Sequence, residues 1–236
     1  MPLLGIGGRQ LYKAETPGPM KDASLTPRIT ETARSLWLVY LGITLACFLS
    51  LKLAGMSWFD AVCHAFSVMG LGGFSTHDAS IEYFHSPAIE MVMIVFMLLA
   101  VMNFATHFLA IREKSLQAYF HDVEGRTSIL LLLGSCVAIA IFLRWQDVYS
   151  GFWTALRFAS FNLVSIATSA GYANTDFALW PMFAPLWMLF LACIGSSSGS
   201  TGGGIKMIRT MILFRQAGRE FTKILHPSAI DPMKIG

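Results

Sequence analysis

The chain has 236 residues, of which 55% are hydrophobic and 13% charged, and its mean hydropathy is +0.58. An ordinary soluble domain carries about 25% charged residues, so this composition argues against a soluble globular protein and for a membrane protein. The formal net charge is only +3, and we expect no nucleic-acid partner. The four cysteines have neither metal-ligand nor disulfide spacing, and we expect them to be small buried apolar residues: Cys47, Cys63, Cys136 and Cys193.

Residues 1–33 lack the apolar core and cleavage site of a signal peptide. Four apolar stretches follow, at residues 36–54, 88–111, 127–143 and 182–214. A bilayer core about 30 Å thick needs roughly 20 apolar residues in a helix. The first two stretches reach this length, and the third is short, with Arg144 placed to reach the interface. The fourth stretch is interrupted.

Two shorter stretches lie between these predicted spans, at residues 57–69 and 152–167. The first would form a helix of about 20 Å, which is too short to cross the bilayer. Ser57 and Asp60 resemble a capping box and predict that this helix begins there. Each half of the chain is therefore predicted to contain a helix, a re-entrant half-helix with a loop, and a second helix.

A short motif follows both half-helices: residues 71–78 read LGGFSTHD, and residues 169–176, 98 positions later, read SAGYANTD. A potassium ion that sheds its water needs rings of carbonyl oxygens, and glycine permits the backbone angles for such a ring. The adjacent aromatic residue can brace the loop, and the C-terminus of the half-helix carries partial negative charge. One copy would indicate a turn, but two equivalent copies predict a pore. The predicted potassium ligands are the backbone carbonyls of Leu71, Gly72, Gly73, Phe74, Ser169, Ala170, Gly171 and Tyr172.

A glycine-rich segment, residues 195–204, interrupts the fourth apolar stretch, and helix is expected to resume at Ile205. Its backbone groups cannot face lipid unpaired, so the segment must face a water-filled path or protein. A Walker A loop is discounted because Ile205 separates Gly204 from Lys206 and no strand precedes the segment. We expect a flexible gating loop beneath the filter, formed by Gly195, Ser196, Ser197, Ser198, Gly199, Ser200, Thr201, Gly202, Gly203, Gly204 and Lys206.

Fourteen of the 17 Lys and Arg residues lie before the first span, between the second and third, or after the glycine-rich segment. The positive-inside rule then places both termini in the cytoplasm and both loops at the outer side. Residues 77–90 carry Asp78, Glu82 and Glu90 but no Lys or Arg, which fits equally an acidic mouth that concentrates cations and a merely solvated loop.

Several other polar residues receive weaker interpretations. Asn103 and His107 are expected to bond to a neighbouring helix, although polar groups inside a membrane are functional candidates. His77 would be a solvated histidine rather than a pH sensor, and His64 has no visible partner. Asp60 is expected to cap its helix. No catalytic constellation emerges, so we do not expect an enzyme.

Four segments carry a resemblance to a known family: residues 8–22 (GRQLYKAETPGPMKD), 72–80 (GGFSTHDAS), 167–172 (ATSAGY) and 199–209 (GSTGGGIKMIR). Through them the chain resembles, along essentially its whole length, the TrkH family of bacterial Trk systems, within the Trk/Ktr/HKT superfamily of potassium transporters. The resemblance implies an all-α membrane protein with potassium-channel-like membrane-pore-membrane repeats, four to a polypeptide. This chain looks like an internal fragment covering the second and third.

On this resemblance, residues 36–113 and 127–218 are the two repeats, 114–126 a cytoplasmic loop, and 1–35 and 219–236 cytoplasmic connections. The family's filter and gating loop fall on the residues given above, while Ala173 and Asn174 depart from the usual Thr-Thr. The resemblance implies potassium uptake across the bacterial inner membrane, contact with membrane lipid, and a homodimer of the full-length protein. It also implies a cytosolic NAD- or ATP-binding regulatory subunit and no organic cofactor on this chain.

Two alternatives remain open at this point. The chain could be a non-conducting scaffold that folds or binds the regulatory ring without carrying ions. Alternatively, two copies of a two-repeat chain could place four filters around one axis, since closed symmetric assemblies are common.

Overall fold

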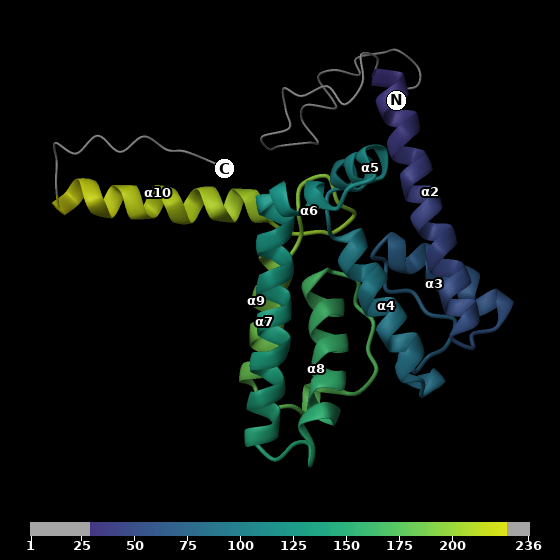
Figure 1. Ribbon diagram of the computed structural model, residues 1–236. Helices are drawn as coiled ribbons and strands as arrows, with labels where there is room; N and C mark the ends of the chain where they lie inside the picture. Colours follow the sequence, from purple (N-terminus) through teal and green to yellow (C-terminus); the bar gives the residue numbers. More distant parts are fainter. Residues whose placement is uncertain (1–28, 226–236) are drawn as a thin grey trace.

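The computed structural model describes residues 29–225. Within this range all the regular secondary structure is helical, and the helices are joined by loops (Figure 1). The predicted segment 8–22 and the end of the predicted C-terminal connection lie outside the described residues. In chain order the elements are α2 (Ile29–Leu53), α3 (Trp58–Met69), the 3-10 helix η3 (Ser80–Phe84), α4 (Pro87–Ala100), α5 (Phe104–Glu113), α6 (Gln117–His121), α7 (Val123–Trp145), α8 (Phe152–Ala167), the 3-10 helix η4 (Phe177–Leu179), α9 (Phe183–Ile194) and α10 (Met207–Leu225).

Within residues 29–225, two helices are long and apolar enough to cross a membrane: Glu31–Leu53 within α2, and α7. The third predicted span was too short, because α7 covers 23 residues. It begins earlier than predicted because Asp122 caps it: one carboxylate oxygen accepts a hydrogen bond from the Gly125 N–H at 2.9 Å. Helix α9 is also apolar but has only 12 residues before the glycine-rich segment begins.

The second predicted span, residues 88–111, was wrong as a single straight helix. It is divided into α4 and α5, which meet at a bend of 95°. Asn103 causes the second helix to start afresh, because its side chain accepts the Ala105 N–H at 2.9 Å as an N-cap. The Phe104 N–H is paired with the Gly199 carbonyl at 3.2 Å, so the glycine-rich segment stabilises the break.

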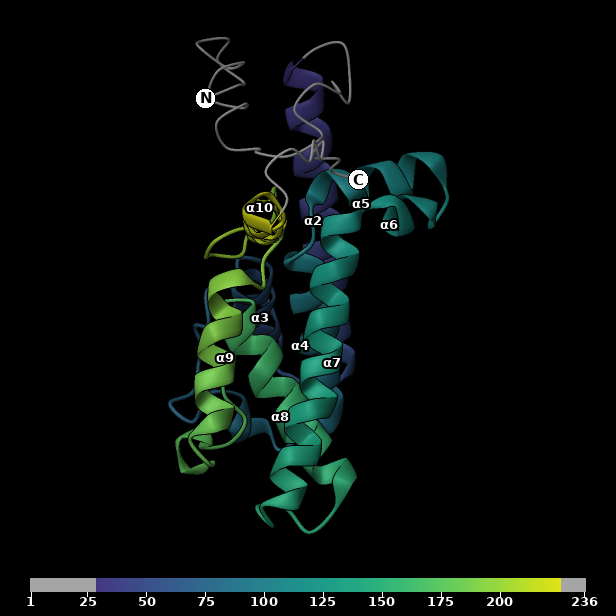
Figure 2. The ribbon, with the colours of Figure 1, turned by 90° about the vertical axis from the view of Figure 1, so that its left-hand side faces the viewer.

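The two half-helices are α3 and α8. Helix α3 starts after the predicted cap: the Ser57 hydroxyl accepts the Asp60 N–H at 3.0 Å and donates to the Asp60 carboxylate at 2.7 Å. Both half-helices end where the sequence predicts, at Met69 and Ala167. Helix α3 packs against α2 and α4, and α8 packs between α7 and α9, so the chain forms two similar halves side by side (Figures 1 and 2).

An ion pair joins the two halves. The Arg157 guanidinium on α8 donates two hydrogen bonds of 2.7 Å to the two carboxylate oxygens of Glu90 on α4. The Glu90 side chain is only 4% exposed. Neither an acidic mouth nor a solvated loop, the two interpretations left open for residues 77–90, describes Glu90, because its carboxylate is buried and paired with Arg157.

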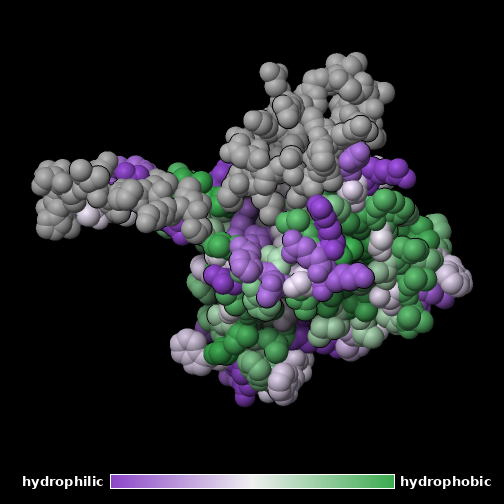
Figure 3. Space-filling model, turned by 45° about the horizontal axis from the view of Figure 1, so that its top comes forward, coloured by the Kyte–Doolittle hydropathy of each residue, from purple (hydrophilic) through white to green (hydrophobic). Residues whose placement is uncertain are grey.

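The sides of the bundle are apolar. Exposed hydrophobic residues recur every four positions along α2, at Trp37, Leu41, Leu45 and Leu49, and a second stripe follows α7, at Leu130, Leu133, Val137 and Ile141. Figure 3 shows hydrophobic residues around the bundle and hydrophilic residues gathered on the end that faces the viewer. These stripes have the spacing of helix faces that contact lipid. Among the cysteines, Cys47 and Cys136 are buried as predicted, whereas Cys193 is exposed.

Helix α10 differs from the predicted continuation of the fourth span. It begins at Met207 rather than Ile205 and extends to Leu225, past the predicted end of the repeat at residue 218. In Figure 1 it leaves the bundle sideways, across the direction of α7 and α9. The chain therefore turns at the glycine-rich segment and does not continue straight through a membrane. Within the predicted cytoplasmic loop, residues 114–126, the structure contains the short helix α6 and the start of α7.

Candidate filter and glycine-rich loop

The loops that follow α3 and α8 share one backbone arrangement. We call residues 71–74 the first loop and residues 169–172 the second loop. Three backbone hydrogen bonds at the first loop recur with similar lengths 98 positions later at the second. The pairs are Gly70 N–H to Phe66 O (2.9 Å) and Thr168 to Val164 (2.9 Å); Leu71 to Val68 (3.1 Å) and Ser169 to Ile166 (3.0 Å); and Gly72 to Ser67 (2.8 Å) and Ala170 to Ser165 (2.8 Å).

The backbone angles repeat as well. Leu71 has a φ of 51° and Gly73 of 71°, while their counterparts Ser169 and Gly171 have 66° and 87°. The residues between them have negative φ. Leu71 and Ser169 carry a steric cost of about 1–2 kcal/mol each in this region. The ends of α2, α5 and α7 also have a positive φ, at Gly55, Lys114 and Asp147, with the same capping hydrogen bonds. The two motif loops differ from these caps in the second positive φ, at Gly73 and Gly171.

The two aromatic residues of the motif have different surroundings. Tyr172 is fully buried, and its hydroxyl donates to the Phe74 carbonyl at 3.4 Å. The Phe74 N–H donates to the Ser67 hydroxyl at 2.9 Å, but the Phe74 side chain is 80% exposed. The predicted bracing by an aromatic side chain therefore applies to Tyr172 and not to Phe74.

The two loops lie against each other. A β-carbon on Gly73 would be 2.0 Å from the Ala170 carbonyl oxygen, a contact that no side chain permits. Gly171 has open space around it, and a β-carbon there would meet no atom within 4 Å. Gly73 is therefore required by contact as well as by φ, and Gly171 by φ alone.

The glycine-rich loop, residues 195–204, lies beneath both half-helices. A β-carbon on Gly195 would be 2.5 Å from the carbonyl of Ala167, the last residue of α8. The Thr201 hydroxyl lies 3.0 Å from the carbonyl of Met69, the last residue of α3, and 3.2 Å from that of Ala100. The glycine-rich loop therefore lies at the C-terminal ends of both half-helices.

The same loop fills the break between α4 and α5. The Ser197 N–H donates to the Val101 carbonyl at 3.1 Å, and the Thr201 N–H to the Ala100 carbonyl at 3.4 Å. Ser196, Ser197 and Ser198 are buried. Composition predicts a flexible loop, but the structure shows a packed segment whose backbone groups are paired with the broken helix. This explains how irregular backbone can lie between apolar helices.

The side chains of two ionisable residues, Lys206 and Glu124, hold the loop. The Lys206 ammonium group donates to the Gly202 carbonyl, so this predicted residue closes the end of the loop. Sequence analysis missed Glu124, whose Oε1 atom accepts the Ser198 N–H at 2.7 Å and the Ile208 N–H at 3.1 Å. The only feature of the sequence that could have indicated a role for Glu124 is that an acidic residue lies just before an apolar span.

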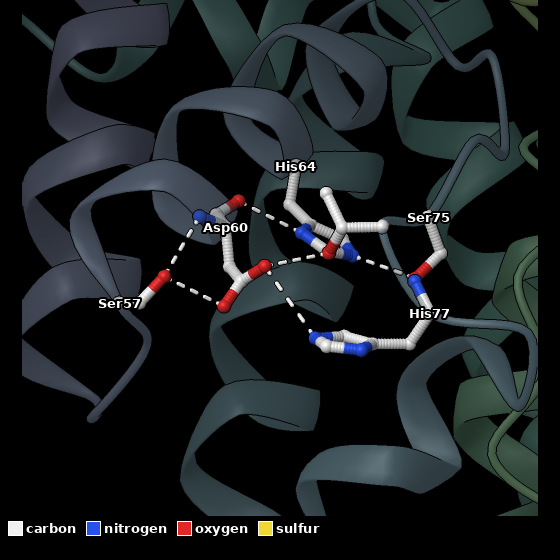
Figure 4. Close-up of polar contacts among 6 residues, drawn as sticks. Ser57, Asp60, His64, Ser75 and His77 are labelled. Carbon is white, nitrogen blue, oxygen red and sulfur yellow. Dashed lines mark hydrogen bonds and ion pairs between the residues drawn. The ribbon is translucent and has the colours of Figure 1, made fainter.

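A polar cluster lies beside the first loop (Figure 4). The Asp60 carboxylate accepts the Thr76 hydroxyl at 2.6 Å and lies 3.4 Å from the His77 Nε2 atom. Hydrogen bonds from Thr76 and Ser57 lower the pKa of the Asp60 carboxyl and favour its charged form. The cap of α3 is therefore Ser57 and not Asp60 as expected: the Asp60 carboxylate accepts the Ser57 hydroxyl and anchors the segment that leaves the loop through Thr76.

The histidines are more enclosed than the sequence suggests. The His64 ring nitrogens lie 2.8 Å from the Asp60 carbonyl and 3.0 Å from the Ser75 hydroxyl, so the expectation that His64 lacks a partner was wrong. His77 stacks on Tyr83 with ring centroids 3.6 Å apart and is partly buried rather than solvated. His107 bonds to a neighbouring helix, as predicted, through the Tyr119 hydroxyl of α6 at 2.9 Å.

Removing the Thr201 hydroxyl tests its link to α3. Thr201→Val keeps the shape of the side chain but leaves the Met69 carbonyl without this donor, and we expect a loss of about 1–3 kcal/mol in unfolding free energy. Thr201→Ser keeps the hydroxyl and should lose less than half as much. Thermal unfolding in detergent measures both variants, and equal stability of the Val variant and the unmodified protein would contradict the link.

The chain is similar to known transport proteins. A family model described as "TrkH: Cation transport protein" matches residues 1–236. The chain is 47% identical to the Trk system potassium uptake protein TrkH of Halomonas elongata and 45% identical to that of Salmonella typhimurium, each over 236 residues. The crystal structure of the potassium transporter TrkH from Vibrio parahaemolyticus matches with a TM-score of 0.88 and 41% identity, over 98% of this chain and 50% of that one. The two alignments to the curated relatives cover 100% of this chain and 49% of each relative, so the chain spans about half their length.

Proposed function

Because the chain belongs to the TrkH family of cation transport proteins, we propose that it forms part of the potassium pathway of a bacterial uptake transporter. The observation that carries the proposal is the pair of positive φ values that recurs at residues 71–74 and 169–172, where Gly73 and Gly171 follow the strained residues Leu71 and Ser169. Two loops with one conformation, each at the end of a half-helix, supply matching rows of carbonyl oxygens.

In this proposal potassium is the transported ion, and backbone carbonyls of the two loops replace its water. The C-termini of α3 and α8 end beside the loops and add partial negative charge where the ion passes. Asp60, held in its charged form, attracts cations toward the outer side of the first loop. Uptake follows the electrochemical gradient, since a membrane potential contributes about 2.3 kcal/mol per 100 mV for each charge that enters.

The glycine-rich loop is proposed as the gate. It lies directly beneath both half-helices, and its contacts are hydrogen bonds that a small displacement would break. We propose both termini in the cytoplasm, supported by Arg112, Lys114 and Arg126 between the second and third spans. Lipid contact with the apolar sides, a homodimer and a cytosolic NAD- or ATP-binding regulatory subunit complete the proposal.

A non-conducting scaffold is the second candidate. The observation that favours it is that the side chain of Phe74, the last residue of the first loop, is 80% exposed and does not brace that loop. A scaffold would fold and insert without supporting uptake.

Complementation separates the two functions. Cells that lack potassium uptake should regain growth at low potassium when they express a transporter that contains these 236 residues. The Gly73→Ser variant should be inserted to the same level but should not restore growth. Growth that is restored equally by this variant would contradict the proposed pathway, and no growth with the unmodified protein would favour the scaffold.

A further inference from the structure

The buried carboxylate of Glu124 connects three elements that the proposed gate must coordinate. It belongs to the first turn of α7, and a single oxygen accepts hydrogen bonds from the glycine-rich loop and from α10. We propose that Glu124 is a positioning residue: its hydrogen bond holds the glycine-rich loop in the position that closes the ion pathway. When α10 moves, this hydrogen bond breaks and the loop is released. This inference rests on the proposed function of the loop as a gate.

The Glu124 carboxylate lies at the N-termini of two helices, α7 and α10. Ile208 is the second residue of α10, and the N–H groups of a first helical turn have no partner within their own helix. The Glu124 Oε1 atom accepts the Ile208 N–H at 3.1 Å from outside that helix. Because Glu124 also lies in the first turn of α7, its side-chain oxygens are near the positive ends of two helix dipoles.

The loop contact is the shorter of the two. The Ser198 N–H donates to Oε1 at 2.7 Å, a distance typical of hydrogen bonds to charged acceptors. Glu124 is 8% exposed and Ser198 is 4% exposed, so water does not compete freely for this bond. If the carboxylate were removed, the Ser198 N–H would be left buried and without this acceptor.

The opposite end of the loop has a separate attachment. The Lys206 ammonium group donates to the Gly202 carbonyl, and Lys206 is the residue directly before α10. The side chains of Glu124 and Lys206 therefore hold the loop at two separate places, Ser198 and Gly202. Both attachments depend on where α10 begins, because Ile208 and Lys206 lie at its N-terminus.

A movement of helix α10 would act directly on the hydrogen bond between Ile208 and Glu124. It contains 19 residues, leaves the bundle sideways in Figure 1 and contacts α7. Its first residues, Met207 and Ile208, are buried, whereas Phe214 and Phe221 are about 70% exposed. A displacement of the exposed part would pull on Ile208. Hydrogen bonds weaken steeply as they lengthen, so a shift of about 1 Å would break the bond to Glu124.

The experiment measures rubidium flux into liposomes that contain the purified transporter without any regulatory subunit. Glu124→Ala removes both hydrogen bonds and should raise this basal flux by at least about tenfold, since a hydrogen bond to a charged group is worth that factor. Glu124→Gln retains an amide oxygen that can accept both N–H groups, and its flux should stay within about threefold of the unmodified protein. Glu113→Ala removes an exposed carboxylate at the end of α5 and should change nothing.

The outcomes separate this inference from the proposed function. A Glu124→Ala flux that is equal to or below the unmodified flux would overturn this role of Glu124, as would equal increases in the Ala and Gln variants. Adding Gly73→Ser to Glu124→Ala should abolish the increase. If that double variant keeps the raised flux, the ions do not pass the first loop, and the proposed pathway itself fails.

Discussion

Replacing Gly73 by Ser is expected to abolish discrimination of potassium from sodium and to lower rubidium uptake by at least about tenfold. The new side chain would overlap the Ala170 carbonyl, because even a β-carbon would be 2.0 Å away. Overpacking costs about 1–3 kcal/mol, and a left-handed conformation in a residue other than glycine adds about 1–2 kcal/mol. The two loops cannot both keep their backbone in this variant.

Gly171 supplies the matched comparison. Gly171→Ala has the same kind of positive φ, 87°, but its β-carbon would meet no atom within 4 Å. Only the conformational cost of about 1–2 kcal/mol remains, so this variant should retain measurable selective uptake. The relative permeation of rubidium and sodium in liposomes measures both variants. Equal behaviour of the two would show that the contact between the loops is not what Gly73 maintains.

Breaking the ion pair between Glu90 and Arg157 is expected to cause the largest loss of stability. Arg157→Leu leaves the Glu90 carboxylate buried, with its side chain 4% exposed, and without its bidentate partner. Removing one partner of a buried pair costs about 3–5 kcal/mol, and we expect the lower end because the Arg157 side chain is 35% exposed. The reason is the uncompensated charge, and the expected result is a large drop in the unfolding temperature in detergent.

The chain offers a control for this variant. Arg144 pairs with Asp147 at 2.9 Å, but their side chains are 46% and 89% exposed. Arg144→Leu should therefore cost no more than about 1 kcal/mol. A double variant, Arg157→Leu with Glu90→Leu, removes both charges and should recover most of the lost stability. If Arg157→Leu and Arg144→Leu lower stability equally, the ion pair does not join the two halves.

The half-helices could be predicted well because their signals are local. Ser57 and Asp60 are three positions apart and form the cap that starts α3. Helix α8 occupies the predicted residues 152–167, since an apolar stretch follows Gly151 and ends before the second motif. The repeat itself is also local in each copy, and the strained residues Leu71 and Ser169 occupy the same place in both.

The break between α4 and α5 could not be predicted in the same way. The apolar run continues on both sides of residues 101–103, so hydropathy alone indicates one helix. The bend is fixed by the carbonyl of Gly199, which accepts the Phe104 N–H from a distant part of the chain. Asn103 was interpreted as a bond to a neighbouring helix, although a cap within its own helix also explains an Asn in an apolar run.

Long-range side-chain pairs were missed for the same physical reason. Glu90 and Arg157 are 67 positions apart, and Glu124 and Ser198 are 74 positions apart. Their partners are set by how the two halves pack, which composition and spacing do not encode. His64 likewise gains its second partner, Ser75, only after the chain turns back at the first loop.

The most direct test of the account is rubidium uptake into liposomes that contain a transporter with these 236 residues, measured against competing potassium and sodium. The unmodified protein should take up rubidium in a manner that potassium blocks and sodium does not. A Gly73→Ser/Gly171→Ser double variant, inserted to the same level, should lose this uptake. Uptake by the double variant that matches the unmodified protein in rate and selectivity would contradict the claim that the two loops line the ion pathway.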